Sequence, residues 1–535
     1  MPLSPSAHVD SFCRDLLPPS DQWPDLLFSL PALAYGSTLN CGTELLDGGV
    51  ERFGAERSCI VAEDGTSWTY GELLARANQI ANVLVDDLGV VPGNRVLLRG
   101  PNSPALVACW FAVVKAGAVA VTTMPMLRAA ELRPIVARAE PTAALCDHRL
   151  LGELADAAPA LPTVAYGGDD ATDLSKRSAS KPAVFADVAT AADDVVFIAF
   201  TSGTTGQPKA CAQFHRDVLA TADTFSAHVL RPNADDLFTG SPPLGFTFGL
   251  GAELVFPLRV GAATLMIEQP TPDRLAEAIG RHGVTVLSTA PTAYRALLKL
   301  DGADLSSLRR CVSAGETLLK ATWEAFHDAT GVRIIDGIGS TEMLHIFIAS
   351  ADDDIRPGST GRVVPGYEAM IIDDDGIPVP DGTVGRLAVR GPTGCRYLDD
   401  PRQATYVRDG WNVTGDAYLR DADGYFWYQA RTDDMIISAG YNIAGPEVEA
   451  ALLGHPDVSE VGVVGAPDRE RGMIVKAFVV LREGATADAV TAAALQDHVK
   501  ATIAPYKYPR AIEFVDSLPK TATGKLQRYK LRDTR

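Results

Sequence analysis

Residues 201–209 read Thr-Ser-Gly-Thr-Thr-Gly-Gln-Pro-Lys and follow an uncharged run of β-branched and aromatic residues, Val195–Phe200. Such a run predicts a buried strand. The nonapeptide combines hydroxyls, two glycines and a lysine. Glycines let backbone N–H groups converge on an anion, and hydroxyl and ammonium groups donate to phosphate oxygens. We interpret this stretch as a phosphate-binding loop, the alternative being a flexible surface loop.

The loop differs from a Walker A loop. Gln207 and Pro208 separate Gly206 from Lys209, and an alanine follows the lysine. The phosphate-binding candidates in this loop are Thr201, Ser202, Gly203, Thr204, Thr205, Gly206 and Lys209.

Composition excludes several classes of protein. The 535 residues carry a net charge of -19, which argues against a nucleic-acid or anionic-membrane partner, so an anionic ligand must be held by local donors. The eight cysteines lack CxxC spacing and the nine histidines form no ligand pair, which predicts reduced thiols and no zinc site. The N-terminus shows no signal peptide, and the most apolar run, Ala105–Val114, is too short to span a bilayer. We expect a cytoplasmic protein.

Residues 1 to about 45 are polar and rich in proline, and we expect them to form a surface strap. Strand and helix patterns alternate from Ser67 to about residue 360, which predicts parallel sheets covered by helices. The stretch 153–192 is acidic and poorly patterned, and we expect it on the surface. Short antiparallel strands follow residue 360. From Asp433 the pattern changes to a compact α+β tail. We therefore predict two domains, 1–432 and 433–535, with the boundary at Arg431–Asp434.

Small residues follow two further predicted strands. Ser313–Glu316 follows one, and Asp336–Glu342 follows a strand at Arg333–Ile335. Ligands bind at such strand ends in α/β sheets. Glu342 could face a Mg²⁺ bound to nucleotide phosphates, the alternative being a carboxylate that stabilises a helix N-terminus.

Each of three later residues could likewise bind a ligand or have an ordinary structural role. Asp416, expected in a tight turn that ends a strand, could accept from ribose hydroxyls or could be an ordinary turn aspartate. Arg431 could contact a ligand or form an interface salt bridge. Lys525 lies in a Gly/Thr loop near the C-terminus and could reach a phosphate or stay solvated.

Together these motifs resemble the acyl-adenylate-forming superfamily, which includes acyl- and aryl-CoA synthetases, nonribosomal-peptide adenylation domains and firefly luciferase. The motifs are Thr201–Lys209, Gly339–Glu342, Thr414–Asp416, Arg431–Asp434 and Pro519–Lys525. Further stretches are similar to the benzoate-CoA ligase branch, and most of all to its 2-aminobenzoate (anthranilate)-CoA ligase group. These are Asp336–Phe347, Gly391–Tyr397 and Ser438–Glu449.

The resemblance implies an α/β fold with a large N-terminal domain of helix-covered sheets, a distorted β-barrel subdomain and a small mobile α+β C-terminal domain. It implies that an aryl carboxylate, 2-aminobenzoate or another benzoate-type acid, reacts with Mg·ATP to give aryl-AMP and pyrophosphate. The thiol of coenzyme A then gives aryl-CoA and AMP. We expect a monomer or homodimer. The alternatives are an adenylation enzyme that loads a carrier-protein thiol and a non-catalytic nucleotide sensor.

The resemblance also assigns roles to residues. Lys525, Thr341 and Glu342 would be catalytic, with Glu342 facing the Mg²⁺, and Asp433 would be the hinge. Besides the loop, the ATP-binding residues would be Ser313, Ala314, Gly315, Glu316, Asp336, Gly337, Ile338, Gly339, Ser340, Asp416, Tyr428 and Arg431.

An aryl pocket and a coenzyme A site complete the implied set. The pocket would comprise Phe246, Phe248, Gly249, Ala314, Gly337, Gly339, Leu344 and His345. The two glycines would leave a flat slot for a planar ring, and His345 could orient the substrate or be a structural histidine. Coenzyme A would contact Ser438, Ala439, Gly440, Tyr441, Arg471 and Lys507.

Overall fold

The structure is a computed structural model that describes residues 3–201, 208–431, 436–438, 441–468, 472–503, 505–520 and 526–532. Its contacts divide the chain into two compact units, which are treated separately below. Unit 1 comprises Met1–Pro357, Gly361–Glu368 and Val389–Asn412, and unit 2 comprises Gly358–Thr360, Ala369–Ala388 and Val413–Arg535. The expected domain boundary at residue 433 lies outside the described residues and stays a prediction.

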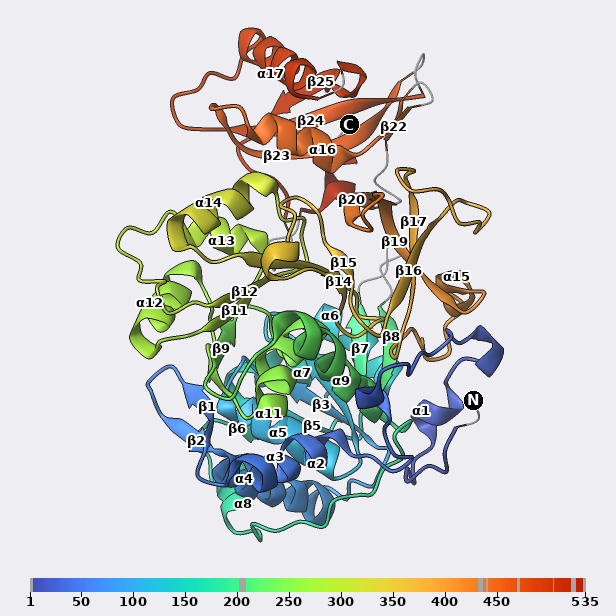
Figure 1. The fold of residues 1–535 in the computed structure, drawn as a ribbon. Coiled ribbons are helices and arrows are strands. Elements are labelled where there is room, and N and C mark those ends of the chain that lie inside the picture. Colours follow the sequence, from blue (N-terminus) through green and yellow to red (C-terminus); the bar gives the residue numbers. More distant parts are fainter. Residues whose placement is uncertain are drawn as a thin grey trace. The chain divides into compact units, whose positions relative to one another are not determined.

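One sheet of unit 1 has the strand order β6-β5-β3-β4-β7-β8 (Figure 1). Its strands are β3 (Arg95–Arg99), β4 (Val119–Thr123), β5 (Ala143–Asp147), β6 (Thr163–Tyr166), β7 (Val195–Thr201) and β8 (Lys209–Phe214). Neighbouring strands are parallel except β7 and β8, which are antiparallel. The uncharged run before the loop is therefore a strand, as the sequence predicts, and it lies inside the sheet.

A second sheet of unit 1 has the order β15-β14-β13-β12-β11-β9-β10-β1-β2. Its strands are β1 (Ser58–Ala62), β2 (Ser67–Thr69), β9 (Leu237–Gly240), β10 (Ala263–Met266), β11 (Val286–Thr289), β12 (Arg310–Ser313), β13 (Ile334–Gly339), β14 (Ile346–Ala349) and β15 (Arg362–Val363). The strands from β1 through β10, β9, β11 and β12 to β13 are parallel neighbours. Between β13 and β14 the pairing becomes antiparallel, so these two strands form a hairpin.

Helices pack on both sheets because their sequences place apolar residues at helical spacing. In α5 (Pro104–Lys115) the Ser103 hydroxyl accepts from the Leu106 N–H, proline occupies the first turn, and nearly every side chain is buried. The longer helices besides it are α4 (Tyr70–Asn82), α6 (Ala129–Ala139), α9 (His215–Thr221), α12 (Pro272–His282), α13 (Pro291–Leu297) and α14 (Lys320–Thr330). None of the helices within the described ranges is long and apolar enough to cross a membrane.

A sheet with the order β16-β17-β19-β18, in which β18 and β20 both pair antiparallel with β19, is the expected barrel-like subdomain. Its strands are β16 (Glu368–Ile372), β17 (Gly385–Arg390), β18 (Val407–Arg408), β19 (Trp411–Arg420) and β20 (Phe426–Arg431). The chain passes from one unit to the other within β16, β17 and β19.

The C-terminal part of unit 2 has its own sheet, with the order β22-β21-β24-β23 and β25 paired to β24. Its elements are β21 (Ile436–Ser438), β22 (Tyr441–Ile443), α16 (Gly445–Leu453), β23 (Val458–Asp468), β24 (Gly472–Leu481), α17 (Ala489–Thr502), β25 (Ala511–Phe514) and α18 (Arg528–Arg532). A buried apolar cluster joins α16 and α17 to this sheet. The α/β class with a small α+β tail, expected from the sequence, is therefore confirmed.

The stretch 153–192 contains β6, α8 (Leu174–Ala179) and most of α7 (Leu151–Ala157), and most of its residues are at least partly exposed, as the sequence predicts. Two local predictions were wrong. Residues 336–339 do not follow a strand but belong to β13, because Asp336 pairs with Ser313 of β12 and residues 337–339 pair with β14. Asp416 lies inside β19, not in a turn, because β20 extends the pairing to Arg420.

Candidate active site

The predicted phosphate-binding loop joins two antiparallel neighbours of one sheet. Thr201 is the last residue of β7 and Lys209 the first of β8, and the two are Cα partners. Ser202, Gly203, Thr204, Thr205 and Gly206 lie outside the described residues. The sheet therefore fixes both ends of the loop at the same strand end.

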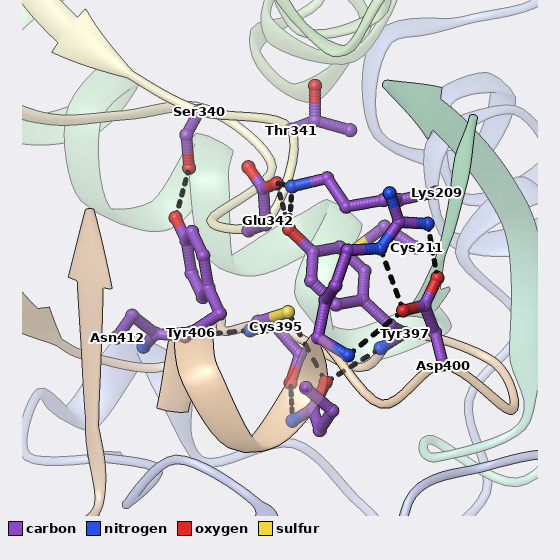
Figure 2. A network of polar contacts seen from close by, with 12 residues as sticks. Lys209, Cys211, Ser340, Thr341, Glu342, Cys395, Tyr397, Asp400, Tyr406 and Asn412 are labelled. Atoms are coloured by element: carbon purple, nitrogen blue, oxygen red, sulfur yellow. Dashed lines mark hydrogen bonds and ion pairs between the residues drawn. The ribbon is translucent and has the colours of Figure 1, made fainter. Parts of the chain in front are cut away.

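The Lys209 ammonium forms a cluster with two other polar groups, the Glu342 carboxylate and the Tyr397 hydroxyl (Figure 2). Its Nζ is 3.2 Å from Glu342 Oε1 and donates to the Tyr397 hydroxyl at 2.5 Å. It also lies 4.6 Å from the centroid of the Tyr397 ring and 5.7 Å from that of Tyr406. The Lys209 side chain keeps 17% of its surface exposed, whereas the Glu342 side chain keeps 8%. Two motifs that the sequence separates by 133 positions therefore meet in one charged site.

Glu342 follows β13 in the short connection to β14, and several hydrogen bonds hold that connection. The Met343 N–H donates to Ser340 Oγ at 3.2 Å, and this hydroxyl lies 3.4 Å from the Tyr406 hydroxyl. Gln213 of β8 donates from Nε2 to the Thr341 carbonyl at 2.9 Å. The strand that carries Lys209 thus also positions the backbone beside Glu342.

Tyr397 is a site residue that the sequence-based assignment missed. Its hydroxyl donates to Glu342 Oε1, and its backbone N–H donates to Gln403 Oε1 at 2.9 Å. Tyr397 is fully buried and bridges to Cys211 of β8. The only sequence signal was its place in the stretch Gly391–Tyr397, which carried the family resemblance but no chemical pattern.

Two cysteine thiols, those of Cys395 and Cys211, lie next to this cluster. Cys395 Sγ donates to Gln403 Oε1 at 3.4 Å, and Gln213 Nε2 donates to Cys211 Sγ at the same distance. Burial raises the pKa of the Cys395 thiol well above its ordinary value. The eight cysteines of the sequence all lie in the described part of the chain, and each is a buried free thiol.

The predicted nucleotide residues of β12 and β13 lie next to each other in the sheet. Ser313 and Asp336 are Cα partners on parallel strands, and burial raises the pKa of the Asp336 carboxyl well above its ordinary value. Gly315 has φ +87°, a conformation that favours glycine, directly after β12. Ala314, Gly315 and Glu316 thus form the turn that leaves this strand end.

The glycines of β13 are required by the hairpin itself. A Cβ at Gly337 would lie 2.8 Å from side-chain atoms of Ile346, and one at Gly339 would lie 2.7 Å from the His345 carbonyl oxygen. Ile338 between them pairs with Ile348. The close approach of β14 accounts for both glycines, and the flat slot for an aromatic ring stays a prediction.

His345 lies among aromatic rings. Its ring centroid is 4.6 Å from that of Phe256, 5.4 Å from Phe225 and 5.7 Å from Phe248. Burial lowers the pKa of His345 to about 3, and a contact with the Phe248 backbone partly offsets this shift. The imidazole is therefore neutral at pH 7, with 3% of its surface exposed.

The other predicted pocket residues flank this histidine in the chain or lie on α10 (Thr247–Leu250). Leu344 is buried and has φ +69°, which tightens the turn before His345. Phe246 caps α10, and Phe248 and Gly249 lie inside it. A Cβ at Gly249 would collide with the carbonyl oxygens of Pro242 and Pro243.

Unit 2 carries the remaining predicted residues that the structure describes. Asp416 and Arg431 are Cα partners on β19 and β20, and Tyr428 packs its ring 5.4 Å from that of Tyr418. Ser438 ends β21 and is buried, and Tyr441 begins β22. Lys507 donates to both oxygens of Glu447 at 2.6 Å. Asp433, Ala439, Gly440, Arg471 and Lys525 lie outside the described residues.

The described residues fit a magnesium ion only as a companion of a nucleotide. They contain no group of three or more His, Cys, Asp or Glu side chains that could hold a metal by themselves. Mg²⁺ in nucleotide sites takes one or two carboxylates together with phosphate oxygens and water. The single buried carboxylate of Glu342 suits that arrangement, so Glu342 would hold the ion.

Comparisons with known proteins agree with this geometry. The family model described as AMP-binding enzyme matches residues 47–396, and that described as AMP-binding enzyme C-terminal domain matches 447–525. A benzoate–CoA ligase of Thauera aromatica is 36% identical over 485 residues, which cover 88% of this chain and 92% of that protein.

Solved structures match over nearly the whole chain. The anthranilate CoA ligase AuaEII in complex with anthranoyl-AMP has a TM-score of 0.88 at 35% identity, with 94% of this chain and 98% of the other covered. A benzoate CoA ligase from Burkholderia xenovorans LB400 has a TM-score of 0.85 at 33% identity, with 92% and 100% covered. The chain therefore belongs to the AMP-binding enzyme family, the acyl-adenylate-forming superfamily, and within it to the AMP-forming acid–CoA ligases of the benzoate-CoA ligase branch.

Proposed function

We propose that this protein is an ATP-dependent aryl acid–CoA ligase, with 2-aminobenzoate or a closely related benzoate as its acid. The observation that carries the proposal is the meeting of Lys209 and Glu342 at 3.2 Å beside the strand end that bears the Thr201–Lys209 loop. A cation for phosphates and a carboxylate for a divalent ion are the two groups that Mg·ATP requires.

In the first half-reaction the aryl carboxylate attacks the α-phosphate of ATP, forming aryl-AMP and releasing pyrophosphate. Both reactants are anions, so positioning and electrostatic shielding supply the catalysis. Lys209 and its loop hold the β- and γ-phosphates, Thr341 contacts the α-phosphate, and Lys525 bridges the carboxylate and the α-phosphate. When bound, Mg²⁺ neutralises phosphate charge.

The same proposal assigns residues to the adenine and the ribose of ATP. The β12 and β13 residues around Ser313 and Asp336 would hold the adenine, where burial favours the protonated form of the Asp336 carboxyl, the form that can donate a hydrogen bond. Asp416 would accept from the ribose hydroxyls, with Tyr428 and Arg431 nearby in the paired strand.

In the second half-reaction the coenzyme A thiol attacks the acyl carbon, forming the thioester and releasing AMP. We propose that the domain 433–535 rotates about Asp433, which removes Lys525 and brings the Gly440 segment to the pantetheine path. Ser438 and Tyr441 flank that segment in β21 and β22. The free buried cysteines are in keeping with a reducing cytoplasm.

His345 supports a benzoate with an ortho substituent. A neutral imidazole can accept a hydrogen bond from an ortho amino group and can donate to a carboxylate. The three phenylalanine rings around it offer apolar surface for a planar ring. The two similar solved enzymes are named for anthranilate, which carries an ortho amino group, and for benzoate, which shares only the planar ring and the carboxylate.

The test is pyrophosphate release with benzoate, 2-aminobenzoate, salicylate and 4-hydroxybenzoate, followed by thioester formation with free coenzyme A or a holo-carrier protein. We expect the highest kcat/KM with 2-aminobenzoate or benzoate, and thioester formation with free coenzyme A. Substituting His345→Leu should lower the ratio of kcat/KM for 2-aminobenzoate to that for benzoate by about tenfold, the value of one hydrogen bond. Absence of pyrophosphate release with every acid would refute the proposal.

A further inference from the structure

Tyr397 connects the two charged groups of the site. Lys209 Nζ donates to the Tyr397 hydroxyl at 2.5 Å, and that hydroxyl donates in turn to Glu342 Oε1. The same carboxylate oxygen lies 3.2 Å from Lys209 Nζ (Figure 2). Lys209 and Tyr397 therefore share one oxygen of Glu342, Oε1.

Tyr397 is the fixed member of this cluster. It has no exposed surface, its backbone N–H is held by Gln403, and it bridges to Cys211 in the neighbouring strand. Burial and the Glu342 charge raise the pKa of its phenol, so the hydroxyl keeps its proton and remains a donor to Glu342.

Lys209 is the group that can move. Its ammonium ends a flexible four-carbon stem, and part of its side chain is exposed. As it lies in the structure, its charge compensates Glu342 and would repel a divalent cation that approached the carboxylate alone. The described residues supply no cluster of three ligands for such a cation, and Mg²⁺ beside a single carboxylate completes its shell with phosphate oxygens and water.

We propose that Tyr397 is a positioning residue that couples the binding of the divalent cation to that of the nucleotide. When the metal–nucleotide complex arrives, Lys209 exchanges Glu342 for phosphate oxygens. Tyr397 keeps its hydrogen bond to Oε1 and leaves Glu342 aimed at the metal. This inference rests on the proposed assignment of the site to Mg·ATP.

The test measures Mn²⁺ binding by electron paramagnetic resonance, with and without α,β-methylene-ATP, on the full-length protein. Mn²⁺ shares the octahedral oxygen preference of Mg²⁺. The variants are Lys209→Met, Tyr397→Phe, and Lys209→Met combined with Glu342→Gln. Tyr166→Phe is the matched control, because it removes a buried hydroxyl that donates to the Arg99 carbonyl at 3.1 Å, away from the cluster.

We expect Lys209→Met to tighten Mn²⁺ binding without nucleotide by about fivefold or more, the lower range of measured site couplings. Adding Glu342→Gln should abolish that gain. Tyr397→Phe should weaken Mn²⁺ binding in the nucleotide complex by about tenfold or more, as the loss of a hydrogen bond to a metal ligand does. In steady-state assays, Tyr397→Phe should raise the half-saturating Mg²⁺ concentration by a larger factor than the KM for the acid.

Two results would overturn the inference. One is an unchanged Mn²⁺ affinity of Lys209→Met without nucleotide. The other is a Tyr397→Phe variant that binds Mn²⁺ as Tyr166→Phe does. Because the titration contains neither acid nor thiol, this outcome is independent of whether aryl acids are activated.

Discussion

Arg396 Nη1 lies 2.7 Å from Asp217 Oδ2, and neither side chain has any exposed surface. The guanidinium is also stacked 4.0 Å from the centroid of the Phe214 ring. Arg396 directly precedes Tyr397, so this buried ion pair anchors the segment that delivers the tyrosine hydroxyl to Glu342.

Asp217→Asn should destabilise the protein by about 3 kcal/mol or more, because a buried guanidinium loses its counter-charge. Combining it with Arg396→Met should restore part of the loss, because the unpaired charge is then removed. Urea unfolding midpoints measure both effects. Glu324→Gln is the control, because its pair with Lys320 is exposed, and it should change stability by less than about 1 kcal/mol. Equal effects of Asp217→Asn and Glu324→Gln would contradict the prediction.

Glu253 predicts a pH dependence of stability. It is fully buried, its only hydrogen bond in the described structure is from Asn102 Nδ2 at 3.1 Å, and burial raises its pKa well above the ordinary value. The folded state keeps the proton while the unfolded state loses it above about pH 4.3. The contribution of Glu253 to the free energy of unfolding therefore decreases as pH rises above that value, by at most about 1.4 kcal/mol per pH unit.

Glu253→Gln removes this ionisation. Its stability relative to the parent protein should rise between pH 5 and pH 8 and should show no such gain at pH 4. Thermal unfolding across that range measures the difference, with the exposed Glu277→Gln as control. A pH-independent difference would show that Glu253 does not titrate between the two states.

Gly249→Ala should disturb the predicted aryl pocket. The new methyl group would collide with the carbonyl oxygens of Pro242 and Pro243, at a cost of about 1–3 kcal/mol. Because Phe246 and Phe248 flank this position in α10, we expect a higher KM for the acid with a smaller change in the KM for ATP. Gly152→Ala in α7 is the control, because a methyl group there meets open space. Steady-state kinetics measure the KM for the acid and the KM for ATP. Equal changes in these two values would contradict the pocket assignment.

Lys525→Ala should abolish pyrophosphate release and largely spare thioester formation from supplied aryl-AMP, because the lysine charge acts only on the attack at the α-phosphate. The two half-reactions are assayed separately. Lys520→Ala is the control, because Lys520 pairs with Glu460 at 2.7 Å. Equal loss of both half-reactions would refute the role of Lys525.

Asp433→Pro should spare aryl-AMP formation and impair thioester formation. Proline fixes φ near −65°, so the proposed hinge could no longer rotate. Rapid-quench measurement of aryl-AMP against aryl-CoA separates the two steps. An unchanged overall turnover would count against rotation at this residue.

The sequence alone was sufficient for the strand before the phosphate loop and for the α+β tail. Val195–Phe200 became β7 because a buried central strand needs an uncharged, β-branched run, and such a run carries its own pattern. Helix α16 (Gly445–Leu453) has Pro446 in its first turn, where a missing N–H breaks no intrahelical hydrogen bond.

Tertiary structure decided what local pattern could not. Residues 337–339 are strand because β14 pairs with them, and Asp416 is strand because β20 pairs with it. The sequence named Lys209 and Glu342 each as a candidate within its own motif, but their separation of 133 residues gives no local sign that the two meet. Tyr397, a further 55 residues from Glu342, carries no spacing signal at all. Its hydroxyl reaches the carboxylate because β8 pairs with the 396–398 segment, and pairing between distant strands is fixed by packing rather than by neighbours in the chain.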